Sequence, residues 1–187
     1  MKERFANVLA SGSDLLLKSA PVFDSTRDNY SSALEELEAV STMVNEQVSS
    51  GLLESPFNDV RLVNSLGVVT KKLEPGQVGK PKLRVVVDAA ASGINDCMMD
   101  MPFPMPRIGD VVRSGKLGWW MAKFDLRDGF YHIPVDKRVV SMLGIKHPLT
   151  NEFASYRFLC FGHKYAPFFF FKERCVNYVE CCSTLDC

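Results

Sequence analysis

Two aspartates stand three residues apart in the stretch FDLRDGFYHIPV, which covers residues 124–135. Asp125 ends an apolar run, WWMAKFD, that we expect to form a buried strand, and Asp128 follows in a turn that contains glycine. Carboxylates at such a strand end can hold divalent metal ions, and two-metal phosphoryl transfer needs two ions held about 4 Å apart. The spacing alone leaves a plainer alternative open, in which Asp128 caps a turn and Asp125 pairs with a lysine.

Basic residues gather on a second predicted element, a β-hairpin. Its strands, Leu66–Leu73 and Leu83–Asp88, are rich in β-branched residues, and a tip dense in glycine and proline joins them. The hairpin can grip phosphates, because each neutralised phosphate releases condensed counterions. It can equally be a solvated edge hairpin that uses lysine to block aggregation. Five cations stand against the single acid Glu74 here: Lys71, Lys72, Lys80, Lys82 and Arg84.

The cysteines do not predict a metal site. Four of the six lie between Cys175 and Cys187, and their spacing lacks the two short pairs that a zinc site requires. We expect reduced thiols packed on or near a terminal helix.

Length and composition indicate a globular chain with one domain, or one domain plus an arm. Of 187 residues, 47% are apolar and 24% are charged. The net charge of zero hides an asymmetry, since residues 1–60 carry four Lys and Arg against ten Asp and Glu, whereas residues 61–187 carry eighteen against twelve. No apolar run is long enough to span a membrane, and the N-terminus is too polar for a signal peptide. We therefore expect an intracellular protein, cytoplasmic or nuclear and not secreted.

The remaining elements must position the two aspartates and the hairpin. Leu34, Leu37, Val40, Met43 and Val44 form one apolar stripe of a helix. Its start has the spacing of a capping box, and a glycine ends it. The order of elements predicts an α+β fold. The predicted elements are a short helix near Asp14–Lys18, helices at Ser32–Gly51, Ile108–Ser114 and after Pro167, and strands at Val139–Lys146 and Ser155–Cys160 that form a hairpin.

The sequence resembles the reverse transcriptases of retroelements over Ser31–Lys172. The similarity is greatest to gypsy-type LTR retrotransposons and to tyrosine-recombinase elements. The stretch KFDLRDGFYHIPV resembles the first catalytic motif of the family, and VVTKK with KLRVVVD and Ile94–Asn95 resembles its fingers hairpin. Other matches follow in the family's order: SSGLLES, PFPMPRIGDVV, SMLGIKH and YRFLCFGHKYAP.

This resemblance implies the fingers and part of the palm of a right-hand polymerase, with an antiparallel sheet. The implied divisions are a loosely ordered leader at 1–29, fingers at 30–118 and a partial palm at 119–187. The implied activity is RNA-directed DNA synthesis within a retrotransposon Pol polyprotein. The implied cofactor is Mg²⁺, and the implied partners are an RNA or DNA template-primer, deoxynucleoside triphosphates and the remainder of the polyprotein, with no membrane.

The first catalytic motif implies roles for four residues. Asp125 would be the metal-binding aspartate, and Leu126 would lend a backbone carbonyl to a metal ion. Backbone N–H groups around Asp128 and Phe130 would face the incoming triphosphate. The ring of Phe130 would be the steric gate that excludes a ribose 2′-hydroxyl.

The hairpin implies further contacts with the nucleotide. Arg84 matches the arginine that contacts triphosphate, a role that suits the bidentate fork of a guanidinium. Lys72 matches the hairpin lysine of the family, although the long tip also makes Lys80 or Lys82 a candidate.

The third matching element begins with Phe161 and Gly162, which the resemblance places against nucleotide and template. Two departures flank them: Cys160 stands where the family usually has proline, and His163 stands where it has a small aliphatic residue. The stretch DAAASGIN also lacks the usual aromatic–arginine pair.

The second catalytic motif, an aromatic residue followed by x-Asp-Asp, does not occur in the 187 residues. We therefore expect a truncated polymerase domain whose two-metal site is incomplete and which is inactive alone. The alternatives are a catalytically dead nucleic-acid-binding module and a non-functional relic of a mobile element.

Overall fold

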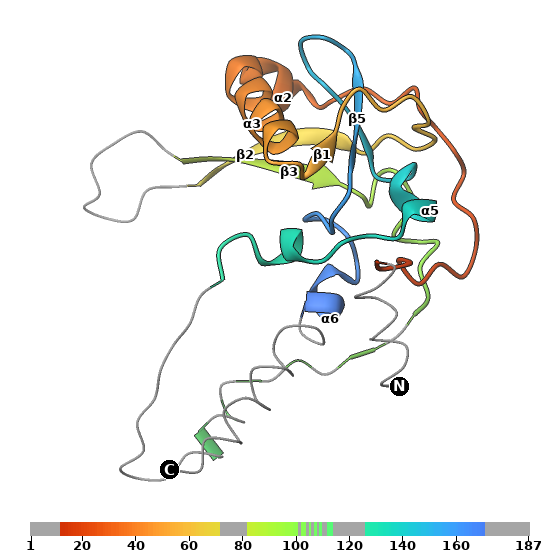
Figure 1. The fold of residues 1–187 in the computed structure, drawn as a ribbon. Coiled ribbons are helices and arrows are strands. Elements are labelled where there is room, and N and C mark those ends of the chain that lie inside the picture. Colours follow the sequence, from red (N-terminus) through yellow and green to blue (C-terminus); the bar gives the residue numbers. More distant parts are fainter. Residues whose placement is uncertain are drawn as a thin grey trace.

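The computed structural model describes residues 12–71, 82–100 and 126–170, with isolated positions at 102, 103, 105, 107, 109, 112 and 113 (Figure 1). Four predicted features lie wholly or mostly outside the described residues. These are the hairpin tip with Lys72 and Lys80, the helix at 108–114, the strand at 119–125 that ends in Asp125, and the chain beyond Phe170.

The helix predicted from the apolar stripe is confirmed, with a break near its start. α2 spans Ser31–Glu35 and α3 spans Leu37–Ser49. Val40 and Val44 on the stripe are buried. Gly51 has a φ of +77°, a conformation that glycine adopts without strain where a helix ends.

The capping box predicted at Ser32 is wrong. The N-cap residue is Tyr30, and no side chain caps the helix there. The Ser32 hydroxyl instead accepts a hydrogen bond from the backbone N–H of Val68 at 3.1 Å. This serine therefore fastens α2 to the neighbouring strand.

The predicted β-hairpin is confirmed. β2 (Ser65–Lys71) pairs antiparallel with β3 (Lys82–Asp88), and the pair extends away from the helices in Figure 1. Leu66 and Val87 face each other in register and are buried at the base of the hairpin. The exposed Arg84 lies opposite Val69.

A second antiparallel sheet has three strands in the order β1-β5-β4. β1 is Leu53–Glu54, β4 is Gly144–Lys146 and β5 is Phe153–Tyr156. The predicted hairpin between β4 and β5 is confirmed, although β5 ends at Tyr156 rather than at Cys160. The fold is thus α+β with antiparallel sheets, as predicted.

The predicted strand at Val139–Lys146 is correct only in its last three residues. Val139 and Val140 belong to the short helix α5 (Lys137–Val140). The Asp136 carboxylate accepts a hydrogen bond from the backbone N–H of Arg138 at 2.8 Å and so begins that helix. Both valines are buried there, so β-branched residues serve the core without forming a strand.

The short helix predicted near Asp14–Lys18 is wrong. Leu15 and Leu16 have positive φ values of 58° and 50° and are both buried in the core. Isolated bridges join Ser13 to Val135 and Leu17 to Met98. This part of the predicted leader therefore packs against segments far along the chain.

Two short helices complete the described fold, and α6 lies below the labelled strands in Figure 1. η1, a 3₁₀ helix, spans Gly129–His132, and α6 spans Ala166–Phe170. The helix predicted after Pro167 is present as far as Phe170, and the rest of it lies outside the described residues. None of the helices in the described chain has both the length and the apolar character that crossing a membrane would need.

Candidate functional site

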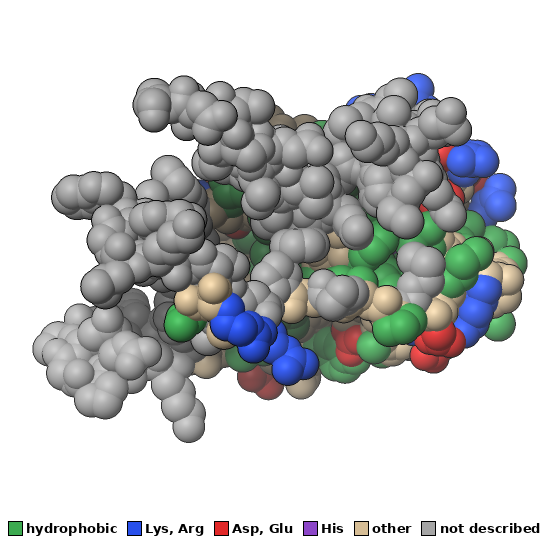
Figure 2. All heavy atoms as spheres, turned by 90° about the horizontal axis from the view of Figure 1, so that it is seen from below, with side chains coloured by type: hydrophobic (Ala, Val, Ile, Leu, Met, Phe, Trp, Pro, Cys, Tyr) green, Lys and Arg blue, Asp and Glu red, His purple; other side chains and the backbone are tan. Residues whose placement is uncertain are grey.

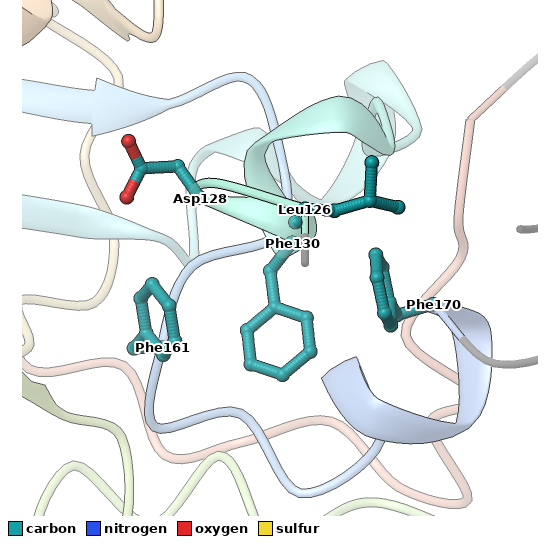
Figure 3. Close-up of a pocket in the computed structure, with 6 residues that line it drawn as sticks. Leu126, Asp128, Phe130, Phe161 and Phe170 are labelled. Atoms are coloured by element: carbon teal, nitrogen blue, oxygen red, sulfur yellow. The ribbon is translucent and has the colours of Figure 1, made fainter. Parts of the chain in front are cut away.

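A pocket of about 200 Å³ opens between η1 and α6. Figure 3 shows the rings of Phe161, Phe130 and Phe170 in a row, with Phe130 in the middle. The centroid of the Phe130 ring lies 4.8 Å from that of Phe161 and 5.7 Å from that of Phe170. The lining is apolar apart from the Asp128 carboxylate, so it suits the face of a planar ring. The lining residues are Leu126, Asp128, Gly129, Phe130, Phe161 and Phe170.

Two backbone features shape the η1 side of the pocket. Asp128 has a φ of 54°, in the left-handed region, and begins the 3₁₀ turn. A Cβ added at Gly129 would lie 2.5 Å from Cε2 of Phe170. Glycine at this position therefore allows the Phe170 ring to lie directly against the backbone of η1.

The opposite wall belongs to the loop that carries Phe161 and Gly162. Gly162 has a φ of +100°, and a Cβ there would lie 2.2 Å from the carbonyl oxygen of Val87. The Asn95 side chain donates to the carbonyl of Gly162 and accepts from the N–H of Lys164, both at 2.9 Å. These contacts fix the loop against the end of β3 and the turn that follows it.

Two tyrosines support the pocket from behind. Tyr131 of η1 stacks on Tyr156 of β5 with 6.1 Å between centroids and 8° between planes, and its ring meets Phe161 edge-on. Burial raises the pKa of Tyr131 to about 12 and that of Tyr156 well above its usual value. Both hydroxyls therefore stay protonated and can donate hydrogen bonds at neutral pH.

Cys160 and His163, the two residues near Phe161 that depart from the family pattern, are buried. Burial raises the pKa of the Cys160 thiol to about 12 and lowers the pKa of His163 to about 4, so both side chains are neutral at pH 7. Among the described residues, neither ring nitrogen of His163 has a hydrogen-bond partner. His163 thus occupies a core position as a neutral side chain.

An ion-paired cluster anchors the far side of the same loop. The Asp100 carboxylate accepts from Lys164 Nζ at 2.5 Å and from Lys18 Nζ at 3.0 Å. These hydrogen bonds lower the pKa of Asp100 to about 2. The cluster joins the N-terminal segment to the loop that follows the pocket wall.

The structure brings four of the predicted site residues to one pocket: Leu126, Asp128, Phe130 and Phe161 line it. Gly162 lies next to Phe161 in the wall loop. Arg84 lies on the exposed face of β3 and is not among the described residues that line the pocket. Asp125 and Lys72 lie outside the described residues, as does the alternative Lys80.

Sequence reasoning missed two residues of the site. Phe170 is not among the residues that the resemblance assigns to the site, yet it lines the pocket. Asn95 was matched only as part of the hairpin element, yet its side chain holds the wall loop. Gly129 and Phe170 are in contact although they lie more than forty positions apart along the chain, so no local sequence pattern could predict this contact.

Among the described residues, no three His, Cys, Asp or Glu side chains form a group that could hold a metal ion. Of the described residues that line the pocket, Asp128 supplies a carboxylate, and its Oδ2 lies 3.3 Å from Nε of Arg127. Mg²⁺ prefers such oxygen ligands and commonly takes one or two carboxylates together with substrate phosphates.

Two solved structures share this architecture, although their sequence identity to this chain is low. The prototype foamy virus protease–reverse transcriptase has a TM-score of 0.62 and 13% sequence identity over 90% of this chain and 20% of its own. A foamy viral protease–reverse transcriptase in complex with double-stranded DNA has a TM-score of 0.61 and 15% identity over 91% of this chain and 32% of its own. The described chain therefore has the fold of a retroviral reverse transcriptase.

Sequence similarity points to a more specific set of relatives, although no protein-family model matches the chain. This chain is 28% identical over 141 residues to a retrovirus-related Pol polyprotein from transposon 412 of Drosophila melanogaster. It is 30% identical over 145 residues to the retrovirus-related Pol polyprotein from transposon 297 of the same organism. Each match covers 74% of this chain but only 11% and 12% of the relatives. The chain is thus a reverse transcriptase-like segment homologous to part of retrotransposon Pol polyproteins.

Proposed function

We propose that the pocket between η1 and α6 binds a deoxynucleoside triphosphate as part of an RNA-directed DNA polymerase domain. The observation that carries this proposal is the convergence of Leu126, Asp128, Phe130 and Phe161 on one pocket. These residues come from two separate sequence matches about thirty residues apart. A chain with the same motifs but a different fold would not be expected to place these four residues at one pocket.

The row of three phenylalanine rings supports a role in nucleotide recognition. Phe161 is 46% exposed, so its face is open to a ligand, whereas Phe130 is held between two neighbours. Stacking on an aromatic side chain contributes roughly 1–3 kcal/mol per base. We assign base or sugar stacking to Phe161 and exclusion of the 2′-hydroxyl to the restrained ring of Phe130.

We propose Mg²⁺ as the cofactor of this site. The Asp125 carboxylate and the Leu126 carbonyl would hold it together with the phosphates of the nucleotide, a donor set that suits a hard cation. The bound ion would neutralise phosphate charge. The chain's own residues would position the ligand: the phenylalanine rings bind it and exclude water, and Arg84 pairs with phosphate oxygens.

We also propose that the chain binds a template-primer. One of the structural neighbours is a complex with double-stranded DNA, and the hairpin of this chain carries five cations against one acid between Lys71 and Arg84. The 187 residues contain no adjacent pair of aspartates. We therefore propose binding of nucleotide and nucleic acid, rather than complete polymerase chemistry, for this polypeptide by itself.

The binding proposal is tested by titrating dTTP, with Mg²⁺ present, into the 187-residue chain by calorimetry. Phe161→Ala is expected to weaken binding about tenfold, because it removes the open stacking face. Phe23→Ala is a matched control, since Phe23 is 47% exposed but does not line the pocket. Equal weakening by both variants, or no binding of dTTP by the unaltered chain, would contradict the proposal.

A further inference from the structure

Gln47, near the end of α3, joins the helix to the two tyrosines behind the pocket. Its amide oxygen accepts a hydrogen bond from the Tyr156 hydroxyl at 2.9 Å, and its amide nitrogen donates to the Tyr131 hydroxyl at 3.3 Å. One side chain of α3 thus satisfies two hydroxyls that lie far from it along the chain. Neither the first catalytic motif nor the hairpin includes this glutamine.

Tyr131 connects Gln47 to the pocket, because its ring contacts the ring of Phe161. The Tyr131 ring is perpendicular to that of Phe161, with 5.7 Å between centroids. The ring centroid of Phe161 in turn lies 4.8 Å from the ring centroid of Phe130. A rotation of Tyr131 about its side-chain bonds would therefore push against the wall of the pocket.

The ring of Tyr131 lies parallel to that of Tyr156, with 6.1 Å between centroids and 8° between planes. Tyr156 itself is almost fully buried and held in β5. The hydrogen bond from Gln47 restrains the hydroxyl end of the Tyr131 ring. Without it, a mostly buried hydroxyl would keep Tyr156 beside it but would lose one of its hydrogen-bond partners, which favours another position of the ring.

We propose that Gln47 is a positioning residue that holds Phe161 in place through Tyr131. Its consequence for nucleotide affinity rests on the proposed function of the pocket. Its consequence for the position of Phe161 does not depend on any ligand. The two consequences can therefore be measured separately.

The first test replaces Phe161 by 4-fluorophenylalanine in the 187-residue chain and records its ¹⁹F resonance without ligand. Gln47→Leu is expected to shift or broaden the resonance, since Tyr131 loses its restraint. Glu46→Leu is the control, because Glu46 is exposed on the same helix and adjacent in sequence. An unchanged resonance in Gln47→Leu, or the same change in Glu46→Leu, would overturn the proposal.

Tyr131→Phe tests the route by which Gln47 acts, and it carries the test if Gln47→Leu does not fold. It removes only the hydroxyl, so it should reproduce the ¹⁹F change of Gln47→Leu. Both substitutions remove the hydrogen bond between Gln47 and Tyr131, and only Gln47→Leu also removes the acceptor of the Tyr156 hydroxyl. If Gln47 acts on Phe161 through Tyr131, the double variant should change the resonance no further. Additive changes would show that Gln47 does not act through Tyr131.

Nucleotide affinity provides the third measurement. Gln47→Leu, in the chain with natural Phe161, is expected to weaken dTTP binding about fivefold, in line with one lost hydrogen bond. If the unaltered chain binds no dTTP, the proposed function fails, while the ¹⁹F result still decides the positioning role. If the chain binds dTTP and Gln47→Leu binds it equally well, the positioning of Phe161 has no part in binding, and the inferred consequence for nucleotide affinity is overturned.

Discussion

His163 is a single residue whose environment changes how the whole chain responds to acid. It is 4% exposed, and neither ring nitrogen has a hydrogen-bond partner in the part of the chain that the structure describes. Burial disfavours the charged imidazolium, which lowers the pKa of His163 from 6.5 to about 4. A small aliphatic residue, which the resemblance implies at this position, would have no such dependence on pH.

The sign of the effect follows from the lowered pKa. Between pH 6.5 and pH 4 the unfolded chain binds a proton at His163 that the folded chain does not bind, so stability falls as the pH falls. When the pH is lowered from 7.5 to 5, His163 should reduce the free energy of unfolding by about 2 kcal/mol. We predict that His163→Leu removes that part of the loss, as measured by urea denaturation at both pH values.

The exposed His132 offers a control for this measurement, since His132→Gln also removes an imidazole. The control should lose as much stability at pH 5 as the unaltered chain does. An equal loss of stability in His163→Leu and the unaltered chain would show that His163 is not buried as a neutral side chain.

At the scale of elements, the wall loop depends on a segment outside the sheets. Asn95, in the turn after β3, makes two hydrogen bonds of 2.9 Å to the backbone of Gly162 and Lys164. The positive φ of Gly162 lets the loop approach the carbonyl of Val87. The Asn95 side chain therefore links the turn after the hairpin to the pocket wall.

We predict that Asn95→Ala releases the loop without unfolding the chain. The N–H of Lys164 would lose its acceptor, and its hydrogen exchange should become roughly fivefold faster, as expected for the loss of about 1 kcal/mol of local stability. Asn58→Ala, in an exposed turn, is the control. Protection of Lys164 that survives Asn95→Ala would mean that other contacts hold the loop.

At the scale of the whole molecule, the zero net charge is a cancellation. The acidic residues concentrate in residues 1–60, and the excess of cations lies beyond residue 60. On the face seen in Figure 2, the described Lys and Arg side chains lie in separate groups with hydrophobic and acidic side chains between them. That face has no continuous basic surface in the part of the chain that is described, so the hairpin is the better candidate for contact with phosphates.

We predict that the chain binds a single-stranded oligonucleotide with a steep dependence on salt. With four phosphate contacts, affinity should fall roughly 50-fold between 50 and 200 mM salt. Arg84→Gln should reduce both the affinity and the slope, whereas Arg157→Gln, outside the hairpin and beside Glu54, should leave the slope unchanged. Fluorescence anisotropy across a salt series measures both quantities, and binding that is independent of salt would exclude phosphate contacts by the hairpin.

Local patterns predicted those parts of the fold that depend on neighbours in sequence. The apolar stripe gave the helix that buries Val40 and Val44, and β-branched runs gave β2 and β3. They failed where distant contacts outweigh local preference. Val139 and Val140 form a helical turn because Asp136 caps it and the core receives both side chains, and Leu15 and Leu16 adopt positive φ values in order to be buried.

The sequence by itself determined which motifs the chain carries and therefore that it resembles a reverse transcriptase. Only the tertiary structure decided how these motifs meet. Phe130 and Phe161 lie about thirty residues apart, and the ring of Phe170 reaches them because Gly129 has no Cβ. Gln47, Asn95 and the buried His163 have roles defined by distant partners or by desolvation, and these depend on packing in three dimensions rather than on order along the chain.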